Sequence, residues 1–209
     1  MAEPIALLVT GASGMLLPRR FLAVAATHPS VARLHLVVSR GASQVLAHEL
    51  GPDATGAQAL IDAAGLDGDA RARVTVHRDN QLDAPISSGS CRLAGTVVLP
   101  ASSGTIGALA TGTAATLIHR AGAVALKERW PLLLGFRETP LSVVHLENLR
   151  ALAYAGATVI PPLPAFYAGG EDPEAWLDAY CQRLLDHLGL GPEGPGRRWG
   201  GGGEAVSPS

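Results

Sequence analysis

Short, continuously apolar runs alternate along the chain with longer stretches of helical periodicity. The runs are IALLVT (5–10), RLHLVVS (33–39), RVTVH (73–77), GTVVLP (95–100), PLLLGF (131–136) and ATVIPP (157–162). Such runs are typical of parallel strands covered on both faces, and the segments between them are mostly long enough to cross back over a sheet. The pattern predicts an α/β fold: a doubly wound, mostly parallel sheet with helices on both faces, in the Rossmann- or flavodoxin-like three-layer αβα arrangement.

Two later segments have the three- and four-residue spacing of amphipathic helices. LSVVHLENLRALAYAGA places Leu146, Leu149 and Leu152 three apart, and PEAWLDAYCQRLLDHLG places Leu177, Tyr180, Leu184 and Leu188 three or four apart. We expect Gly156 and Gly189 to end these helices. Residues 51–72, rich in Ala, Gly and Asp, are compatible with a short exposed helix.

The length of 209 residues suits one sizeable α/β domain. We assign residues 1–190 to this domain. Residues 191–209, GPEGPGRRWGGGGEAVSPS, are rich in Gly, Pro and Ser and have no periodicity. They are therefore expected to form a flexible tail.

Composition excludes several classes of partner. A formal net charge of -2 with scattered arginines argues against nucleic acid. No apolar run is long enough to cross a membrane, and the start MAEPIALLVTG lacks the features of a signal peptide, so we expect a cytoplasmic protein. Cys91 and Cys181 have no ligand-like spacing and are expected to be reduced, packed thiols.

Three Ser/Gly turns are the first candidates for a ligand site. VTGASG follows the first predicted strand, PASSGT follows the fourth, and ISSGS covers residues 86–90. Backbone N–H groups at a helix start bind phosphate well, and turns after neighbouring parallel strands meet at one edge of a sheet. The first turn is not the G-x-G-x-x-G dinucleotide pattern. Tight turns and ordinary helix capping explain each turn separately, but three together favour a phosphorylated ligand.

Charged residues flank the fifth predicted strand. Arg120 and Lys127 precede it, and Arg137 and Glu138 stand at its carboxyl end, where active-site residues of such sheets lie. Lys127 is the only lysine among sixteen basic residues. A lone lysine weakly suggests a site that needs a compact point charge, although chance placement and surface ion pairs are alternatives.

Together these motifs resemble the flavin prenyltransferase family, the UbiX-like proteins. Between residues 86 and 189, ISSGS, LATGTAATLIHRAGAVALKER, FRETPLSVVHLENLRALAYAGATVIPPLPAFY and CQRLLDHLGL follow the family's pattern. VTGASG and VVSRGASQVLAHE match it near the amino terminus. The resemblance covers nearly the whole chain up to the tail, and the combination of motifs is specific although no single motif is.

The resemblance implies that the protein binds FMN. It also implies transfer of a dimethylallyl group from dimethylallyl monophosphate, or the diphosphate, to N5 and C6 of the reduced flavin. The product, prenylated FMN, would serve UbiD-type decarboxylases. The family needs no metal and commonly forms a homododecamer with sites at subunit interfaces.

Residue roles also follow from the resemblance, position by position in the motifs. The FMN-binding residues would be Gly11, Ala12, Ser13, Ser39, Ser102, Ser103, Thr105 and Arg137. The prenyl phosphate would be bound by Ser88, Ser90, Arg120, Lys127, Arg137, Tyr167 and Arg183. Ser13, Glu49, Lys127 and Glu138 would take part in catalysis.

The implied chemistry gives the cations a physical role. A phosphate that leaves an allylic carbon develops negative charge, and preorganised cations in a partly dry pocket stabilise that charge without a metal ion. Lys127 offers a point charge, whereas Arg137 and Arg183 offer planar donors. A proton released at C6 could pass to Glu138 or to the phosphate, and Ser13 could relay a proton.

The sequence also departs from the family's pattern. Some members place a tryptophan before the SGS turn to face the allylic cation, but DNQLDAPI has no aromatic residue. Gly122 and Ala123 stand where an Ala-Asp pair is usual, and Trp130 stands where an arginine is common. Two rival hypotheses follow: an FMN-binding relative that has lost prenyl transfer and acts as a carrier or assembly partner, and, less favoured, a flavin-dependent cysteine decarboxylase.

Overall fold

The computed structural model describes residues 2–164, 166 and 172–191. Its centre is a sheet of six strands in the order β3-β2-β1-β4-β5-β6, and every strand pair is parallel. The strands are β1 (Glu3–Val9), β2 (Val31–Val38), β3 (Val74–Arg78), β4 (Gly95–Ala101), β5 (Leu132–Phe136) and β6 (Thr158–Val159). Each predicted apolar run overlaps one of them, and the predicted fold class is confirmed.

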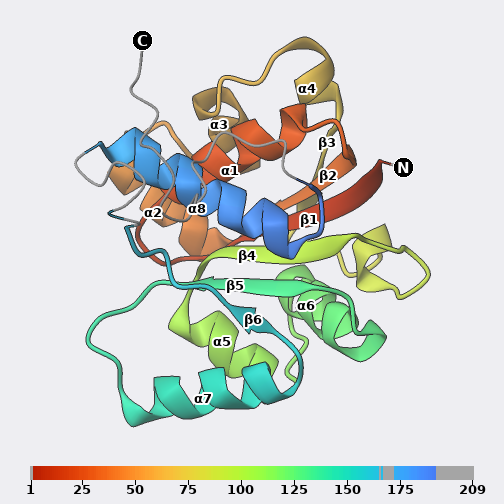
Figure 1. The fold of residues 1–209 in the computed structure, drawn as a ribbon, viewed down its shortest axis with the longest axis vertical. Helices are drawn as coiled ribbons and strands as arrows, with labels where there is room; N and C mark the ends of the chain where they lie inside the picture. The colour runs from red at the N-terminus through yellow and green to blue at the C-terminus, as the bar shows by residue number, and fades with distance from the viewer. Residues whose placement is uncertain (1, 165, 167–171, 192–209) are drawn as a thin grey trace, which may run out of the picture.

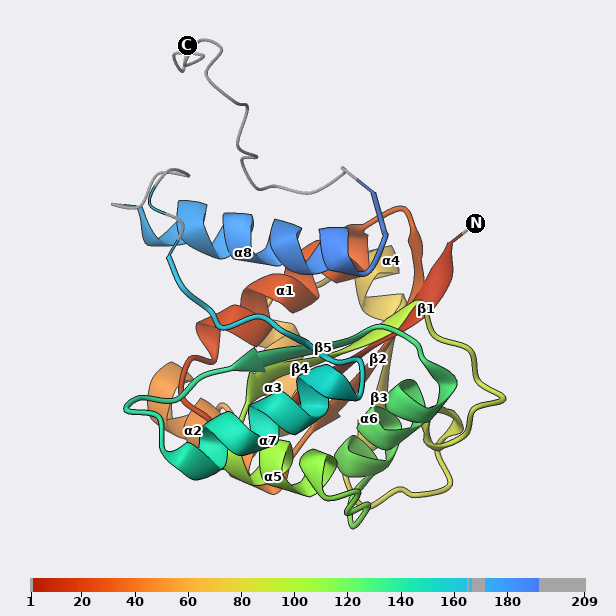
Figure 2. The ribbon, with the colours of Figure 1, turned by 60° about the horizontal axis from the view of Figure 1, so that its bottom comes forward.

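Helices cover both faces of the sheet (Figures 1 and 2). One face carries α1 (Leu16–Thr27), α2 (Arg40–Leu50), α3 (Gly56–Ala63), α4 (Gly68–Ala72) and α8 (Pro173–His187), and the other carries α5 (Ser103–Ala110), α6 (Leu117–Glu128) and α7 (Val143–Tyr154). A short 3-10 turn, η1 (Pro85–Ser87), packs beside α6. Successive side chains of β1 point to opposite faces of the sheet, so the core has two parts. Ile5 and Leu7 face the first helical layer, which contains α1 and α8, and Ala6 and Leu8 face the second, which contains α5 and α6.

The strand order fixes where a ligand can bind. β1 pairs with β2 on one side and with β4 on the other, so the connections turn in opposite directions at this point. In open α/β sheets, ligands bind beyond the carboxyl ends of the strands at such a switch point. The turn after β1 and the turn after β4 both lie there.

Two helix predictions need correction. Residues 51–72 form two helices, α3 and α4, and Leu60 and Ile61 of α3 are buried against the core. In α7 only Leu152 of the three spaced leucines is buried, and Leu146 is 51% exposed. The reason is that α7 packs chiefly on α5, below the sheet in Figure 1, and covers little of the sheet itself. Gly156 and Gly189 follow the ends of α7 and α8 with positive φ, as expected.

Tyr167 and residues 192–209 of the expected tail lie outside the described residues. No helix in the described part is long and apolar enough to cross a membrane.

Candidate functional site

Thr10 ties together the turns that follow β1 and β4. Its hydroxyl donates to the carbonyl of Pro100 at 2.7 Å and accepts from the backbone N–H of Ser102 at 2.8 Å. Thr10 is buried, so these bonds are shielded from water. The two turns therefore form one rigid wall of a crevice at the switch point.

A close backbone approach places the turn after β2 beside the turn after β1. A Cβ at Gly11 would lie 3.0 Å from the backbone carbon of Gly41, so position 11 has little room for a side chain. Ser39 caps α2 by accepting the N–H of Ala42 at 3.0 Å. The Ser39 hydroxyl proton stays available to a ligand in the same crevice.

Glu49 reaches from the last turn of α2 to the start of α1. Its carboxylate accepts the backbone N–H of Gly14 at 2.9 Å and that of Met15 at 2.7 Å. Partial burial raises the pKa of Glu49, but hydrogen bonds from Ser13, Met15 and Gly14 and the charge of Arg137 outweigh burial and hold this pKa below its usual value. The amides at 14 and 15 are thus taken by an internal carboxylate. The expectation that the first glycine turn presents them to a phosphate is wrong in this respect.

The start of α5 is the remaining anion-binding position in the crevice. Ser102 caps α5 and accepts the N–H of Thr105, and the Ser102 and Thr105 hydroxyls lie 3.1 Å apart. A Cβ at Gly104 would meet nothing within 4 Å. The space beside Gly104 is therefore open, and the first N–H groups of a helix lack intrahelical partners, as a phosphate site requires.

Arg137 and Glu138 follow β5 at the same edge of the sheet. The Arg137 N–H reaches the carbonyl of Ala101 at 3.5 Å, and Glu138 accepts the Ser103 hydroxyl at 3.2 Å. We call the residues gathered at this edge the crevice group. They are Gly11, Ala12, Ser13, Ser39, Glu49, Ser102, Ser103, Thr105, Arg137 and Glu138.

A second set of expected residues lies around η1 and α6, and we call it the donor-side group: Ser88, Ser90, Arg120 and Lys127. The Ser88 and Ser90 hydroxyls are 2.9 Å apart, and Arg120 Nε donates to the carbonyl of Ser87 at 3.0 Å. Lys127 approaches the same turn, because a Cβ at Gly89 would lie 2.9 Å from Lys127 Nζ.

Within one chain these two groups do not meet. Lys127 precedes Pro131, whose carbonyl accepts the N–H of Thr96 at the starting edge of β4, whereas Arg137 follows β5 at its carboxyl end. The five residues of β5 alone span about 17 Å. Figure 1 shows the end of α6 and the glycine turn after β1 at opposite ends of the sheet. A single chain therefore does not build the cationic clamp expected from Lys127 and Arg137.

Arg183 is also separate from the donor-side group. It lies on the exposed side of α8, and α8 packs against α1 on the face of the sheet opposite α6. The sheet thus separates Arg183 from Lys127.

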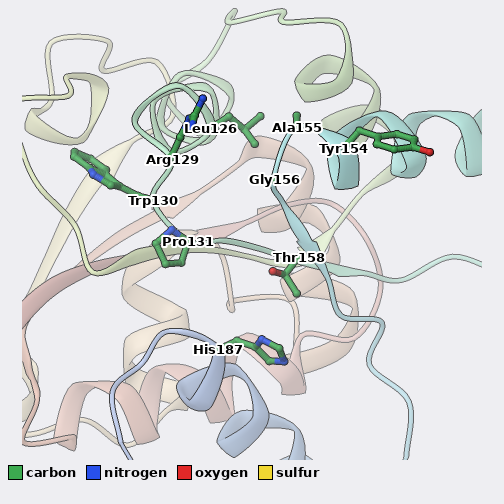
Figure 3. Close-up of a pocket in the computed structure, with 9 residues that line it drawn as sticks. All are labelled: Leu126, Arg129, Trp130, Pro131, Tyr154, Ala155, Gly156, Thr158 and His187. Carbon is green, nitrogen blue, oxygen red and sulfur yellow. The ribbon is translucent and has the colours of Figure 1, made fainter.

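A pocket of about 520 Å³ lies at the starting edge of β5 and β6 (Figure 3). Leu126, Arg129, Trp130, Tyr154 and His187 are among its lining residues. Trp130 is half-buried and packs against the core under α6. This pocket is at the far edge from the crevice group, and we assign it no chemistry.

Comparison with known proteins places these motifs in a family. The profile of the Flavoprotein family matches residues 2–181. The flavin prenyltransferase UbiX of Synechocystis sp. is 38% identical over 207 residues, which cover 97% of this chain and 98% of that protein. The chain belongs to the UbiX flavin prenyltransferase family. UbiX of Pseudomonas aeruginosa is 36% identical, with 95% of this chain and 94% of the relative covered.

Solved structures of UbiX proteins agree with this assignment. AnUbiX (PadA1), crystallised in complex with FMN and dimethylallyl pyrophosphate, superposes with a TM-score of 0.81 at 35% identity, covering 96% of this chain and 99% of that chain. A dodecameric FMN-dependent UbiX-like decarboxylase from Escherichia coli O157:H7 gives 0.80 at 35% identity, with 95% and 100% covered. The cysteine decarboxylase TvaF, at 18% identity and a TM-score of 0.59, shares the fold alone.

The described residues also fit FMN and hold no metal cluster. The crevice offers the open helix start at α5 for a phosphate and small residues around Gly11 for a flat ring. Among the residues that the structure describes, no group of three or more His, Cys, Asp or Glu side chains could hold a metal ion. Sequence reasoning included Thr10 in the VTGASG turn and Glu128 in the LATGTAATLIHRAGAVALKER motif, but it assigned a role to neither residue.

Proposed function

We propose that this protein is a metal-independent flavin prenyltransferase. It joins the dimethylallyl group of dimethylallyl monophosphate or diphosphate to N5 and C6 of reduced FMN, and the prenylated FMN serves UbiD-type decarboxylases. The observation that carries the proposal is the conjunction of an anion-binding helix start among the joined turns at the switch point with a separate serine, arginine and lysine cluster suited to a second phosphate. Binding of FMN alone requires only the first.

The crevice group holds the flavin. The start of α5 binds the FMN phosphate, and the Ser39 hydroxyl donates to a polar atom of the cofactor. The Ser103 hydroxyl, whose proton Glu138 accepts, offers its oxygen to the cofactor as an acceptor. When bound, reduced FMN supplies the nucleophilic N5 and C6 positions. Glu49 accepts hydrogen bonds from Ser13 and from the turn that carries it, so the Ser13 hydroxyl can relay a proton between Glu49 and a flavin bound beside the turn.

The donor-side group binds the prenyl phosphate at an interface between chains. Because Lys127 and Arg137 lie at opposite edges of one sheet, a complete site takes its lysine from one chain and its Arg137 and Glu138 from a neighbour. The cations then stabilise the charge that develops on the departing phosphate. Glu138 of the crevice group accepts the proton released at C6.

A homo-oligomer, as in the dodecameric relative, supplies that neighbour. Large apolar side chains at the start of α7 support such an assembly: Leu141, Val143, Val144 and Leu146 are 46–74% exposed. A contiguous exposed apolar patch of this kind marks a protein contact. We also place the protein in the cytoplasm, where the free thiols of Cys91 and Cys181 stay reduced.

The decisive experiment incubates the purified protein with reduced FMN and dimethylallyl monophosphate or diphosphate under anaerobic conditions. Mass spectrometry then identifies the flavin. A flavin heavier by one five-carbon unit is expected. Unchanged FMN that remains bound at saturating donor would instead indicate a carrier, the rival that the missing aromatic residue in DNQLDAPI favours.

A further inference from the structure

Glu128 lies next to the residues of the donor-side group, although nothing in the sequence pattern marks it. Its carboxylate pairs with Lys127 Nζ. It also lies against Gly89, between the two serines of the turn, because a Cβ at position 89 would overlap Glu128 Oε1. The ion pair is thus packed onto the serine turn, and the Glu128 side chain is only 34% exposed.

The groups around this carboxylate are those that bind phosphate. The Ser88 and Ser90 hydroxyls, the Arg120 guanidinium and the Lys127 ammonium are all hydrogen-bond donors near one turn. A carboxylate and a phosphate carry the same sign of charge and use the same donors. Glu128 therefore occupies a position from which it competes with an incoming phosphate.

We infer that Glu128 is the counter-ion that the donor's phosphate displaces from Lys127, and that it sets the affinity of the site for phosphate. This inference rests on the proposed function, since the ligand is the phosphate of the prenyl donor. Before the donor binds, Glu128 neutralises Lys127. After transfer, Glu128 pairs with Lys127 again and weakens the hold on the released phosphate, which helps that product to leave.

Inorganic phosphate and a prenyl phosphate differ in the contacts that offset the loss of the Glu128–Lys127 ion pair. Inorganic phosphate gains only contacts with the donor-side group. A prenyl phosphate gains the same contacts and also buries its apolar chain beside the flavin. The carboxylate thus keeps free phosphate from occupying the site, while the donor still binds.

The test compares Glu128→Gln with the wild type by isothermal titration with inorganic phosphate. Removing the competing charge should tighten phosphate binding about fivefold, the factor expected for one partly exposed ion pair. The KM for dimethylallyl monophosphate should fall by a similar factor, and inhibition by added phosphate should strengthen. In a Lys127→Ala background, Glu128→Gln should give no gain.

Asp62→Asn is the matched control. Asp62 is an exposed carboxylate of α3, on the opposite face of the sheet, and it pairs with Arg71 of α4 at 2.9 Å. The Asp62→Asn substitution removes the same charge from the protein and should leave phosphate affinity unchanged. An equal gain in phosphate affinity in Asp62→Asn would show that the effect arises from net charge alone, and it would overturn the inference.

The outcomes separate this inference from the proposed function. A wild type that forms prenylated FMN, beside a Glu128→Gln variant with unchanged or weaker phosphate affinity, overturns the role of Glu128 alone. A wild type that forms no prenylated FMN with either donor overturns the proposed function.

Discussion

The carboxylate of Glu49 and the backbone N–H of Met15 are joined by a hydrogen bond of 2.7 Å that links α2 to the first turn of α1. Gly14 donates to the same carboxylate. A helix start leaves N–H groups without intrahelical partners, and here a side chain from another helix satisfies two of them. Glu49 thus acts as a cap for α1 and as the fixed support of the Ser13 turn.

Replacing Glu49 should therefore cost stability in a pH-dependent way. Glu49→Ala is expected to lower the free energy of unfolding at pH 7 by about 1 kcal/mol, the usual size of a lost cap. Because the folded pKa of Glu49 is lowered, its contribution is complete above the usual carboxyl value of 4.5 and is lost as pH falls through the lower folded value. Urea denaturation at pH 7 and pH 3 measures this, and the difference in stability between the two proteins should be smaller at the lower pH.

Glu147→Ala provides the control for this experiment. Glu147 is exposed and pairs with Arg150 within α7. Its loss should change the unfolding free energy by a few tenths of a kcal/mol at most. A Glu49→Ala protein as stable as Glu147→Ala at pH 7 would show that the cap contributes nothing.

His35 and His77 form a buried pair under the second helical layer. Their ring nitrogens Nδ1 and Nε2 are 2.9 Å apart and the rings are stacked. Burial, with help from the nearby charges of His77 and Arg33, lowers the pKa of His35 to about 4, and burial lowers that of His77. A lowered pKa means that the unfolded chain takes up protons first, so stability is present above pH 6.5 and is lost as pH falls toward 4.

His35→Gln should flatten this pH dependence. Between pH 7 and pH 4 the wild type should lose up to about 3 kcal/mol more than the variant, if the shift of His35 is expressed in full. Thermal melts across this pH range provide the measurement, with the exposed His187→Gln as control. Parallel curves for His35→Gln and wild type would contradict the expectation.

His145 connects the two ends of the loop that carries Arg137 and Glu138. Its ring lies edge-on to Phe136, with centroids 5.7 Å apart, and its Nδ1 accepts the N–H of Ser142 at 3.3 Å. His145→Gln keeps an acceptor for Ser142 but loses the ring contact, and His145→Phe does the reverse. Each should lower the kcat of transfer about tenfold, because a displaced loop misplaces the reacting groups.

A double-mutant cycle distinguishes positioning from general loss of stability. If His145 acts through Glu138, then His145→Phe should have little further effect on kcat in a Glu138→Gln background. Additive losses would show that His145 acts elsewhere.

Much of the crevice could be predicted from sequence because its residues follow strands. The runs before Gly11, Ser102 and Arg137 are continuously apolar, and parallel strands bring their carboxyl ends to one edge. The role of Glu49 on α1 could not be predicted in this way, since it depends on how α2 packs beside the first turn. The exposure of α7 likewise depends on its place under α5, because periodicity shows only that one face is apolar.

The separation of Lys127 from Arg137 was implicit in the chain order. A residue before a parallel strand and a residue after it must lie at opposite edges of the sheet. Motif matching groups both residues by role and so hides this geometry. If one site uses both residues, as we propose, its division between chains is a consequence of topology.

Subunit mixing tests that division directly. Lys127→Ala and Arg137→Ala should each reduce transfer by two to three orders of magnitude, roughly as for the loss of one charge-stabilising donor. When both variants are co-expressed with different tags and mixed oligomers are purified, chance places an intact lysine and an intact arginine at about a quarter of the interface sites. Activity should therefore recover to about a quarter of the wild-type value.

A second mixture distinguishes a site that spans two chains from a site that lies in one chain. Wild-type chains mixed equally with Lys127→Ala/Arg137→Ala chains should keep about a quarter of the activity if each site spans two chains, but about half if each site lies in one chain. Recovery in the first mixture requires residues from different chains, because neither variant alone holds both. If the mixed oligomers stay as inactive as the single variants, Lys127 and Arg137 do not share an interface site.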